Sequence, residues 1–153
     1  MAAAATPKID FYVLAGNETR ARLKFACRIA EKAYMAEQRV FVWLEDAVEL
    51  QSFDELLWTF ADRSFVPHEI FSDAQQWRDT PVLLGCQAQP QQPFDVLLNL
   101  GIEVPAAAAR AVRIAEIVDA DEPRRRAGRN RFRHYRDLGL APDTHTIAGE
   151  ETP

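Results

Sequence analysis

Apolar residues along the chain gather in short runs that alternate with longer stretches of helical periodicity. Residues 9–14 are rich in β-branched and aromatic residues and precede a turn signal at residues 15–17, which predicts a strand and then a turn. In residues 18–37 the apolar positions recur every three or four residues, which predicts a helix with one buried face. After the charged Arg39, residues 40–44 form a continuous apolar run, as buried parallel strands do. A second helix is predicted over residues 47–60, where an acidic start complements the helix dipole.

The second half of the chain continues this alternation. Short apolar runs at residues 81–85 and 94–100 predict two more buried strands, joined by a surface loop at residues 87–93, which are rich in glutamine and proline. A final strand is expected near residues 115–118, before a last helix that starts at the acidic residues 119–123 and stops at Gly139. Strands that alternate with helices predict an α/β domain whose mostly parallel sheet is flanked by helices.

Composition supports one folded domain. The chain has 153 residues, of which 48% are hydrophobic and 27% are charged, and these values exclude wholesale disorder. We expect the domain to cover residues 9–140, after a flexible N-terminal tail at residues 1–8. Residues 141–153 are expected to form a polar, loose C-terminal tail, with Ile147 as an exception.

The sequence also indicates the compartment. No window approaches the roughly 20 apolar residues of a transmembrane helix, and the alanine-rich start lacks the features of a signal peptide. Cys27 and Cys86 lie in apolar surroundings without a CxxC pair, which favours reduced, structural cysteines. We therefore expect a cytoplasmic protein that does not enter a membrane.

Motifs for enzyme chemistry are missing from the sequence. No glycine-rich dinucleotide loop follows the first predicted strand, and neither a GxxxxGK[ST] loop nor a GxSxG elbow occurs. Glu45 and Asp46 follow a predicted strand; they could bind a metal or act in acid–base chemistry, or they could simply begin a helix. His68, His134 and His145 are scattered without the spacing of metal ligands. We expect no catalytic residue, no metal and no cofactor.

A concentration of arginine marks the last predicted helix. Seven arginines fall within residues 124–136, although the chain carries a net charge of -5. At about 100° per residue, Arg125, Arg129, Phe132 and Arg136 share one narrow stripe of this helix. The stripe has three interpretations: a solvated basic face with Phe132 in the core, a phosphate-binding patch for nucleic acid, or a pocket for an acidic peptide that ends in an aromatic residue. Gly128, in mid-helix, could allow something to approach closely.

A second candidate surface lies where the second helix ends. Trp58, Phe60 and Phe65 are three large rings within eight positions, and core packing is the default for such rings. However, the segment from Phe65 through Val66 to Pro67 belongs to a connection, and connections usually run over the surface. Exposed rings there would form a partner site.

Together, these segments resemble the chi subunit of bacterial DNA polymerase III holoenzyme, over about residues 9–139. The matching segments are Phe11-Tyr12-Val13-Leu14, Arg39-Val40, Glu45-Asp46, Asp54-Glu55 with Leu57-Trp58, Ser64-Phe65-Val66-Pro67-His68, Asn99-Leu100, Glu116-Ile117-Val118-Asp119, and Arg131-Phe132-Arg133-His134-Tyr135-Arg136 with Gly139. Residues 69–93 depart from the family's pattern, and the family often has tyrosine where Phe132 stands.

The resemblance implies a single Rossmann-like domain without a nucleotide site and a non-catalytic role in replication. It implies binding of the acidic C-terminal tail of single-stranded-DNA-binding protein, which favours the peptide interpretation; this expectation carries over to Arg125, Arg129, Phe132 and Arg136. It also implies a psi-like subunit that tethers the protein to the clamp loader, with a helicase as a possible competitor. This expectation carries over to the aromatic segment Trp58, Phe65, Val66 and Pro67. Direct DNA binding is not expected; the alternative is a single-stranded nucleic-acid binder that uses the arginine helix.

Overall fold

The computed structural model describes residues 6–72 and 79–148. Within them the strands are β1 (Lys8–Leu14), β2 (Val40–Trp43), β3 (His68–Ile70), β4 (Val82–Gly85), β5 (Phe94–Asn99), β6 (Ala111–Val118) and β7 (Asp143–Ile147). The helices are α1 (Thr19–Met35), α2 (Ala47–Thr59), α3 (Glu122–Asp137) and a short 3-10 helix, η1 (Ala106–Arg110). The strands form one sheet in the order β3-β4-β2-β5-β6-β1-β7, and all neighbouring pairs are parallel. The predicted α/β fold with a parallel sheet is confirmed.

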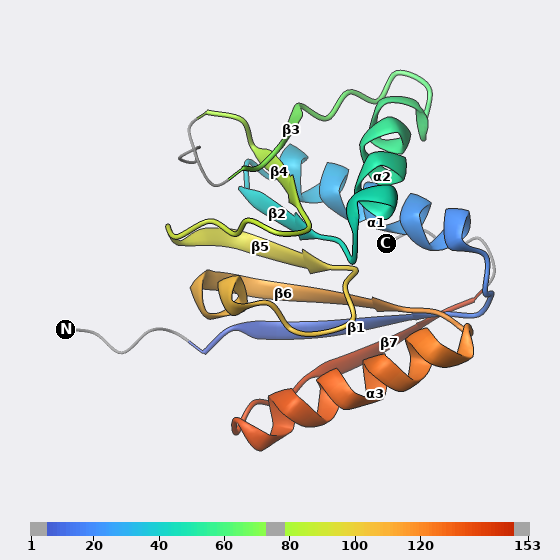
Figure 1. Cartoon of the computed structure of the whole chain (residues 1–153), viewed down its shortest axis with the longest axis vertical. Coiled ribbons are helices and arrows are strands. Elements are labelled where there is room, and N and C mark those ends of the chain that lie inside the picture. The colour runs from blue at the N-terminus through green and yellow to red at the C-terminus, as the bar shows by residue number, and fades with distance from the viewer. Residues whose placement is uncertain (1–5, 73–78, 149–153) are drawn as a thin grey trace.

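Helices cover both faces of this sheet: α1 and α2 lie on one face, and α3 lies on the other (Figure 1). Neighbouring residues of β2 show why this central strand is apolar throughout. Val40 and Val42 pack into the core beneath α1 and α2, whereas Phe41 packs into the core on the α3 side. Because successive side chains of a strand point to opposite faces, a strand covered on both sides needs a continuous apolar run.

The strand boundaries differ from the sequence prediction at two places. His68–Ile70 forms the short edge strand β3, which the sequence pattern did not predict. The last predicted strand begins at Ala111, four residues before the predicted start. Ala111 and Arg113 already pair with β5, and Arg113 also pairs with β1. The N-terminal tail predicted at residues 1–8 lies outside the described residues up to position 5, and Lys8 already belongs to β1.

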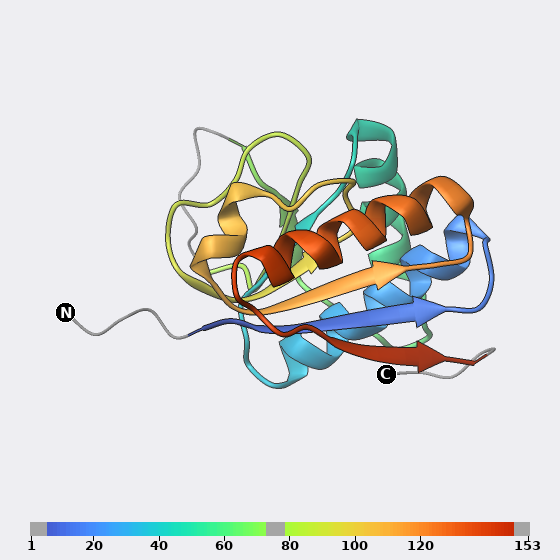
Figure 2. The same ribbon diagram turned by 90° about the horizontal axis from the view of Figure 1, so that it is seen from below.

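The prediction that residues 141–153 form a tail outside the fold is wrong for Asp143–Ile147. These residues form β7, which pairs in parallel with β1 from Asp10↔Asp143 to Leu14↔Ile147. Figure 2 shows β7 on the outer side of β1, at the edge of the sheet. Four of the five side chains are exposed, so this strand lacks the apolar alternation that would have identified it. Residues 149–153 lie outside the described residues.

The side chain of His145 helps to hold this edge strand. Its Nε2 lies 2.8 Å from Oδ1 of the buried Asp10, and its ring stacks on Tyr12 with centroids 5.1 Å apart. Arg113 donates to Asp10 from the other side, at 3.1 Å. Burial alone raises the pKa of Asp10, but the hydrogen bonds from His145 and Arg113 outweigh it, so this pKa lies below its ordinary value.

Candidate partner-binding sites

Helix α3 is built as its sequence predicts. The Asp121 carboxylate caps its start by accepting a hydrogen bond from the Arg124 amide at 3.1 Å, and Pro123 occupies the first turn. Gly139 follows the helix with φ +83°, a left-handed conformation that glycine adopts without strain. Gly128 is buried, and a Cβ there would lie 2.8 Å from Cγ2 of Val118. The group that approaches this glycine is therefore β6 of the same chain.

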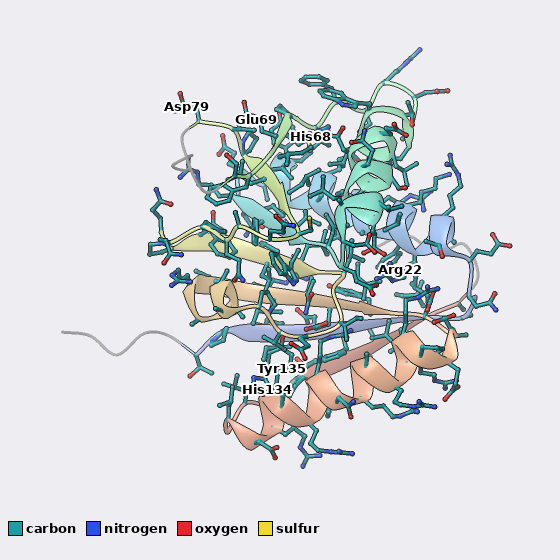
Figure 3. All side chains as sticks on the ribbon, in the orientation of Figure 1. Arg22, His68, Glu69, Asp79, His134 and Tyr135 are labelled. Carbon is teal, nitrogen blue, oxygen red and sulfur yellow. The ribbon has the colours of Figure 1, made fainter. Side chains whose placement is uncertain are left out.

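Two of the seven arginines of α3 are structural. Arg131 is only 5% exposed; its Nε donates to Glu116 at 2.8 Å and its Nη1 to the Ile102 carbonyl at 2.9 Å. The Tyr135 hydroxyl donates to the same buried carboxylate at 2.6 Å, and Tyr135 lies between α3 and the sheet (Figure 3). Burial and the Glu116 charge raise the pKa of Tyr135 far above its ordinary value, so this hydroxyl stays a donor. Arg124 pairs with Asp119 at 2.7 Å.

The other arginines of α3 are exposed, and part of the predicted stripe forms a groove. This open groove is lined by Arg129, Phe132, Arg133, Arg136 and Asp137. Phe132 is half-buried and packs on Phe11, with ring centroids 5.1 Å apart. One side of the ring thus belongs to the core, and the other side lines the groove. This arrangement combines the interpretation that places Phe132 in the core with the one that places it in a peptide pocket.

The groove differs from the predicted stripe at two residues, both on α3. Arg125 is exposed but lies outside the groove lining, one turn earlier, whereas Arg133 lines the groove and was not predicted. Arg129 makes a loose ion pair with Glu122 at 3.5 Å, and both side chains are more than half exposed. Such a pair contributes about 1 kcal/mol or less, so an incoming carboxylate can replace it.

Trp58 and Phe65 form an exposed aromatic patch beside β3. Trp58 is 48% exposed and Phe65 is 62% exposed, and their ring centroids lie 5.5 Å apart. Val66 was predicted to share this surface, but it is fully buried in the core beneath α1 and α2 and cannot touch a partner. Pro67 is half-buried. The sequence missed this division because residue types alone do not show which way each side chain of a connection points.

His68 supports this patch from below. Its Nδ1 lies 2.6 Å from the Val66 carbonyl, and its ring centroid lies 4.3 Å from that of Trp58. Its Nε2 lies 3.1 Å from Oδ1 of Asp54, without the alignment of a hydrogen bond. His68 is buried and holds the connection against the Trp58 ring.

The crevice in which α/β sheets usually hold a nucleotide carries an internal ion pair here. At the carboxyl ends of β1 and β6, the helices that follow leave on opposite faces, which is where ligands bind in such sheets. The buried Asp119 carboxylate stands there with Arg124, whose guanidinium also donates to the Asn17 carbonyl at 3.2 Å. Because Asp119 and Arg124 neutralise each other, this pair offers no free cation to a nucleotide phosphate.

The acidic pair after β2 also has a structural role. The Asp46 carboxylate accepts a hydrogen bond from the Glu49 amide at 2.8 Å and caps α2. Glu45 is exposed, and its backbone amide lies 3.3 Å from the Glu49 carboxylate. This geometry favours the helix start over the acid–base interpretation.

A comparison with solved structures supports the fold. In residues 6–72 and 79–148, no helix has the length and apolar character needed to cross a membrane. The fold is similar to the crystal structure of T4 UvsW, with a TM-score of 0.65 and 10% identity, covering 92% of this chain and 41% of that chain; this likeness concerns the fold alone.

Sequence relatives are more specific. The chain is 34% identical over 140 residues to DNA polymerase III subunit chi of Pseudomonas aeruginosa, covering 92% of this chain and 96% of the relative. It is 27% identical over 139 residues to the Haemophilus influenzae subunit of the same name, covering 90% and 96%. The family model described as DNA polymerase III chi subunit, HolC, matches residues 7–143. The chain therefore belongs to the DNA polymerase III chi subunit family and has an accessory role in DNA replication.

Proposed function

We propose that the protein is a non-catalytic adaptor that binds the acidic C-terminal tail of single-stranded-DNA-binding protein and, through a psi-like subunit, the clamp loader. The observation that carries this proposal is the groove on α3, which is lined by three arginines together with the ring of Phe132. An acidic protein that places exposed arginines along one helix creates a local positive field. A cytoplasmic location is part of the proposal.

The chemistry of the groove fits such a tail. Arginine forms paired hydrogen bonds with a carboxylate, and a terminal phenylalanine would supply both the carboxylate and a ring to pack against Phe132. Arg129 and Arg136 lie on either side of Phe132 along the helix, so both can reach a carboxylate held at the ring. The surrounding charges would speed encounter in a salt-dependent way, while the ring contact would slow release. We expect micromolar affinity, about -8 kcal/mol.

The aromatic patch is the proposed psi-like contact. It lies on α2 and beside β3, at the opposite end of the sheet order from the edge strand β7 and on the other side from α3. The two partners could therefore be held at the same time, as a bridge requires. Trp58 and Phe65 are the anchors in this proposal, because large exposed rings dominate interface energies. A helicase that uses the same rings would compete with the psi-like subunit.

A second candidate function is direct binding of single-stranded nucleic acid by α3. The observation that favours it is the number of exposed arginines on this helix, beyond those that line the groove.

The test is a titration of the whole protein with a fluorescent acidic peptide that ends in Asp-Ile-Pro-Phe. Wild type is compared with Arg129→Ala and with Arg126→Ala, which removes the same charge from an exposed position outside the groove. We expect saturable binding, a loss of roughly tenfold or more for Arg129→Ala, and near wild-type binding for the control. Equal losses in both variants, or tight oligonucleotide binding without peptide binding, would replace the adaptor with the second candidate.

A further inference from the structure

A second basic surface lies on α1, on the other face of the sheet from the α3 groove. Arg20, Lys24 and Arg28 follow each other at every fourth residue, about 6 Å apart along the helix axis. All three line one groove between α1 and the ends of β1 and β7. Within the described residues, none of them forms an ion pair or a side-chain hydrogen bond. These cations are therefore available to a ligand.

The groove beside this row of cations has an apolar floor. Phe25 of α1, Leu14 of β1 and Ile147 of β7 line it, and the last two are half-buried. The floor exists because β7 extends the sheet beyond the reach of α1, which packs over β2, β5 and β6. The sheet thus presents part of its surface next to charged side chains.

Flat rings continue this surface along the sheet. Tyr12 packs near Phe25, with centroids 5.7 Å apart, and the ring of His145 stacks on Tyr12 at an interplanar angle of 23°. The His145 side chain is 46% exposed, so the outer face of the stack is open to solvent. Arg113 fixes the stack by donating to the Tyr12 hydroxyl at 2.6 Å. Such a stack offers a place for one more flat ring.

The acidic groups around the groove do not cancel its charge. Asp119 is already bonded to Arg124, and Asp10 is bonded to Arg113 and His145. Glu18 is the remaining carboxylate of the lining. Three free cations against one free carboxylate leave the groove positive.

We infer that this α1 groove binds single-stranded nucleic acid without regard to sequence. Cations repeated at each helical turn suit a chain of phosphates, and the apolar floor and the open ring stack suit unpaired bases. A duplex would keep its bases away from a floor recessed between a helix and a sheet. An acidic peptide is the less favoured occupant, because a single terminal carboxylate needs converging donors rather than cations spread along a helix.

This inference stands independently of the proposed tail contact, and it revises the sequence-based expectation that the protein does not touch DNA. The α1 groove and the α3 groove lie on opposite faces of the sheet, and both lie near the edge strand β7. Ile147 of β7 lines the α1 groove. In the α3 groove, Phe132 packs on Phe11 of β1, the strand that pairs with β7. A protein held by a tail could therefore also hold a short stretch of uncovered strand. Tethering through the tail would then raise the apparent affinity of the α1 groove for DNA.

The test uses the whole protein and a fluorescein-labelled 20-nucleotide oligothymidylate in low salt. For three phosphate contacts to a single strand, the slope of log K against log salt should be about -2, and Lys24→Gln/Arg28→Gln should reduce it to about -0.7. The same double variant should lose about tenfold or more in affinity. Arg125→Gln/Arg126→Gln, which removes two exposed charges of α3 outside its groove, is the matched control and should retain the slope.

Both variants are also titrated with the acidic tail peptide, and their folding is checked by circular dichroism. Retained peptide binding by Lys24→Gln/Arg28→Gln, together with lost oligonucleotide binding, supports the inference. Loss of peptide binding in that variant would assign the groove to an acidic peptide instead. Absent oligonucleotide binding by wild type, or equal losses in the control, would overturn the inference, whatever the peptide does.

Discussion

Substitution of Arg131 by methionine should unfold the protein more readily without weakening the tail contact. Arg131 belongs to the arginine-rich helix, but its Nε lies 2.8 Å from a Glu116 carboxylate that is fully buried. Arg131→Met leaves that carboxylate with two neutral donors, the Tyr135 hydroxyl at 2.6 Å and the Asn99 amide at 2.9 Å. Breaking one side of a buried pair costs about 3–5 kcal/mol. Because two hydrogen bonds remain, we expect the lower end, about 3 kcal/mol.

The assay combines thermal unfolding with peptide titration. A loss of about 3 kcal/mol should lower the Tm by about 6–12 °C in a domain of this size. Arg131→Met/Glu116→Gln should recover most of this loss, because the carboxylate charge is removed together with its partner. Arg129→Ala should behave in the opposite way, with a Tm close to that of wild type and a loss of peptide binding. The mutant pairs therefore separate the structural arginine from the proposed binding arginine.

Two results would refute this reasoning. An Arg131→Met protein as stable as wild type would mean that the buried network contributes no net free energy to folding. A folded Arg131→Met protein that has lost peptide binding would mean that Arg131 reaches the tail despite being only 5% exposed.

The remaining predictions concern packing, pH and the second surface. Gly128→Ala places a methyl group 2.8 Å from Cγ2 of Val118, so the overpacking cost of about 1–3 kcal/mol should exceed the helix-propensity gain of about 1 kcal/mol. Urea unfolding should therefore show a lower free energy of unfolding, and the difference should be smaller in a Val118→Ala background. Because folding lowers the pKa of Asp10, its carboxylate should stabilise the fold in full at pH values above its ordinary pKa of 3.8, and this contribution should fade as the pH falls through the lower folded-state pKa. The free energy of unfolding, measured from pH 7 to pH 2, should fall less in Asp10→Asn than in wild type. An identical acid profile would contradict the assignment. Trp58→Ala should change the Tm little, because the ring is half exposed, but should abolish co-purification with a psi-like subunit; retained co-purification would remove Trp58 from that contact.

The parts of the fold that the sequence predicted are those in which burial dictates residue type. The run from Val40 to Trp43 is apolar because both of its faces are covered, and that pattern is visible without a structure. Strand β7 could not be recognised in the same way, because an edge strand with exposed side chains is held by backbone pairing and by His145, neither of which leaves an apolar pattern. Backbone pairing depends on which strand happens to be adjacent in space.

The candidate site was predictable in its composition and less so in its geometry. Periodicity placed Arg129, Phe132 and Arg136 on one side of α3, and the structure brings those three together. The same periodicity could not show that Arg131 points into the core, because its partner Glu116 lies 15 positions away on another element. Likewise, Val66 was expected at the surface with Phe65, although adjacent residues of an extended segment face opposite ways. Long-range partners decide such cases.

Internal ion pairs occupy polar groups at the carboxyl ends of the central strands. Asp119 pairs with Arg124 beside the ends of β1 and β6, and the buried Arg22 reaches from α1 to Glu49 of α2 at 3.2 Å and to the Leu100 carbonyl at 2.6 Å. Figure 3 places Arg22 beside the carboxyl ends of the central strands. These contacts use the polar groups that would otherwise receive a small ligand, and they satisfy the loops and helix starts that meet there. Exposed cations of α1 and α3 line open grooves, and such grooves suit an extended polymer or a peptide tail better than a small molecule.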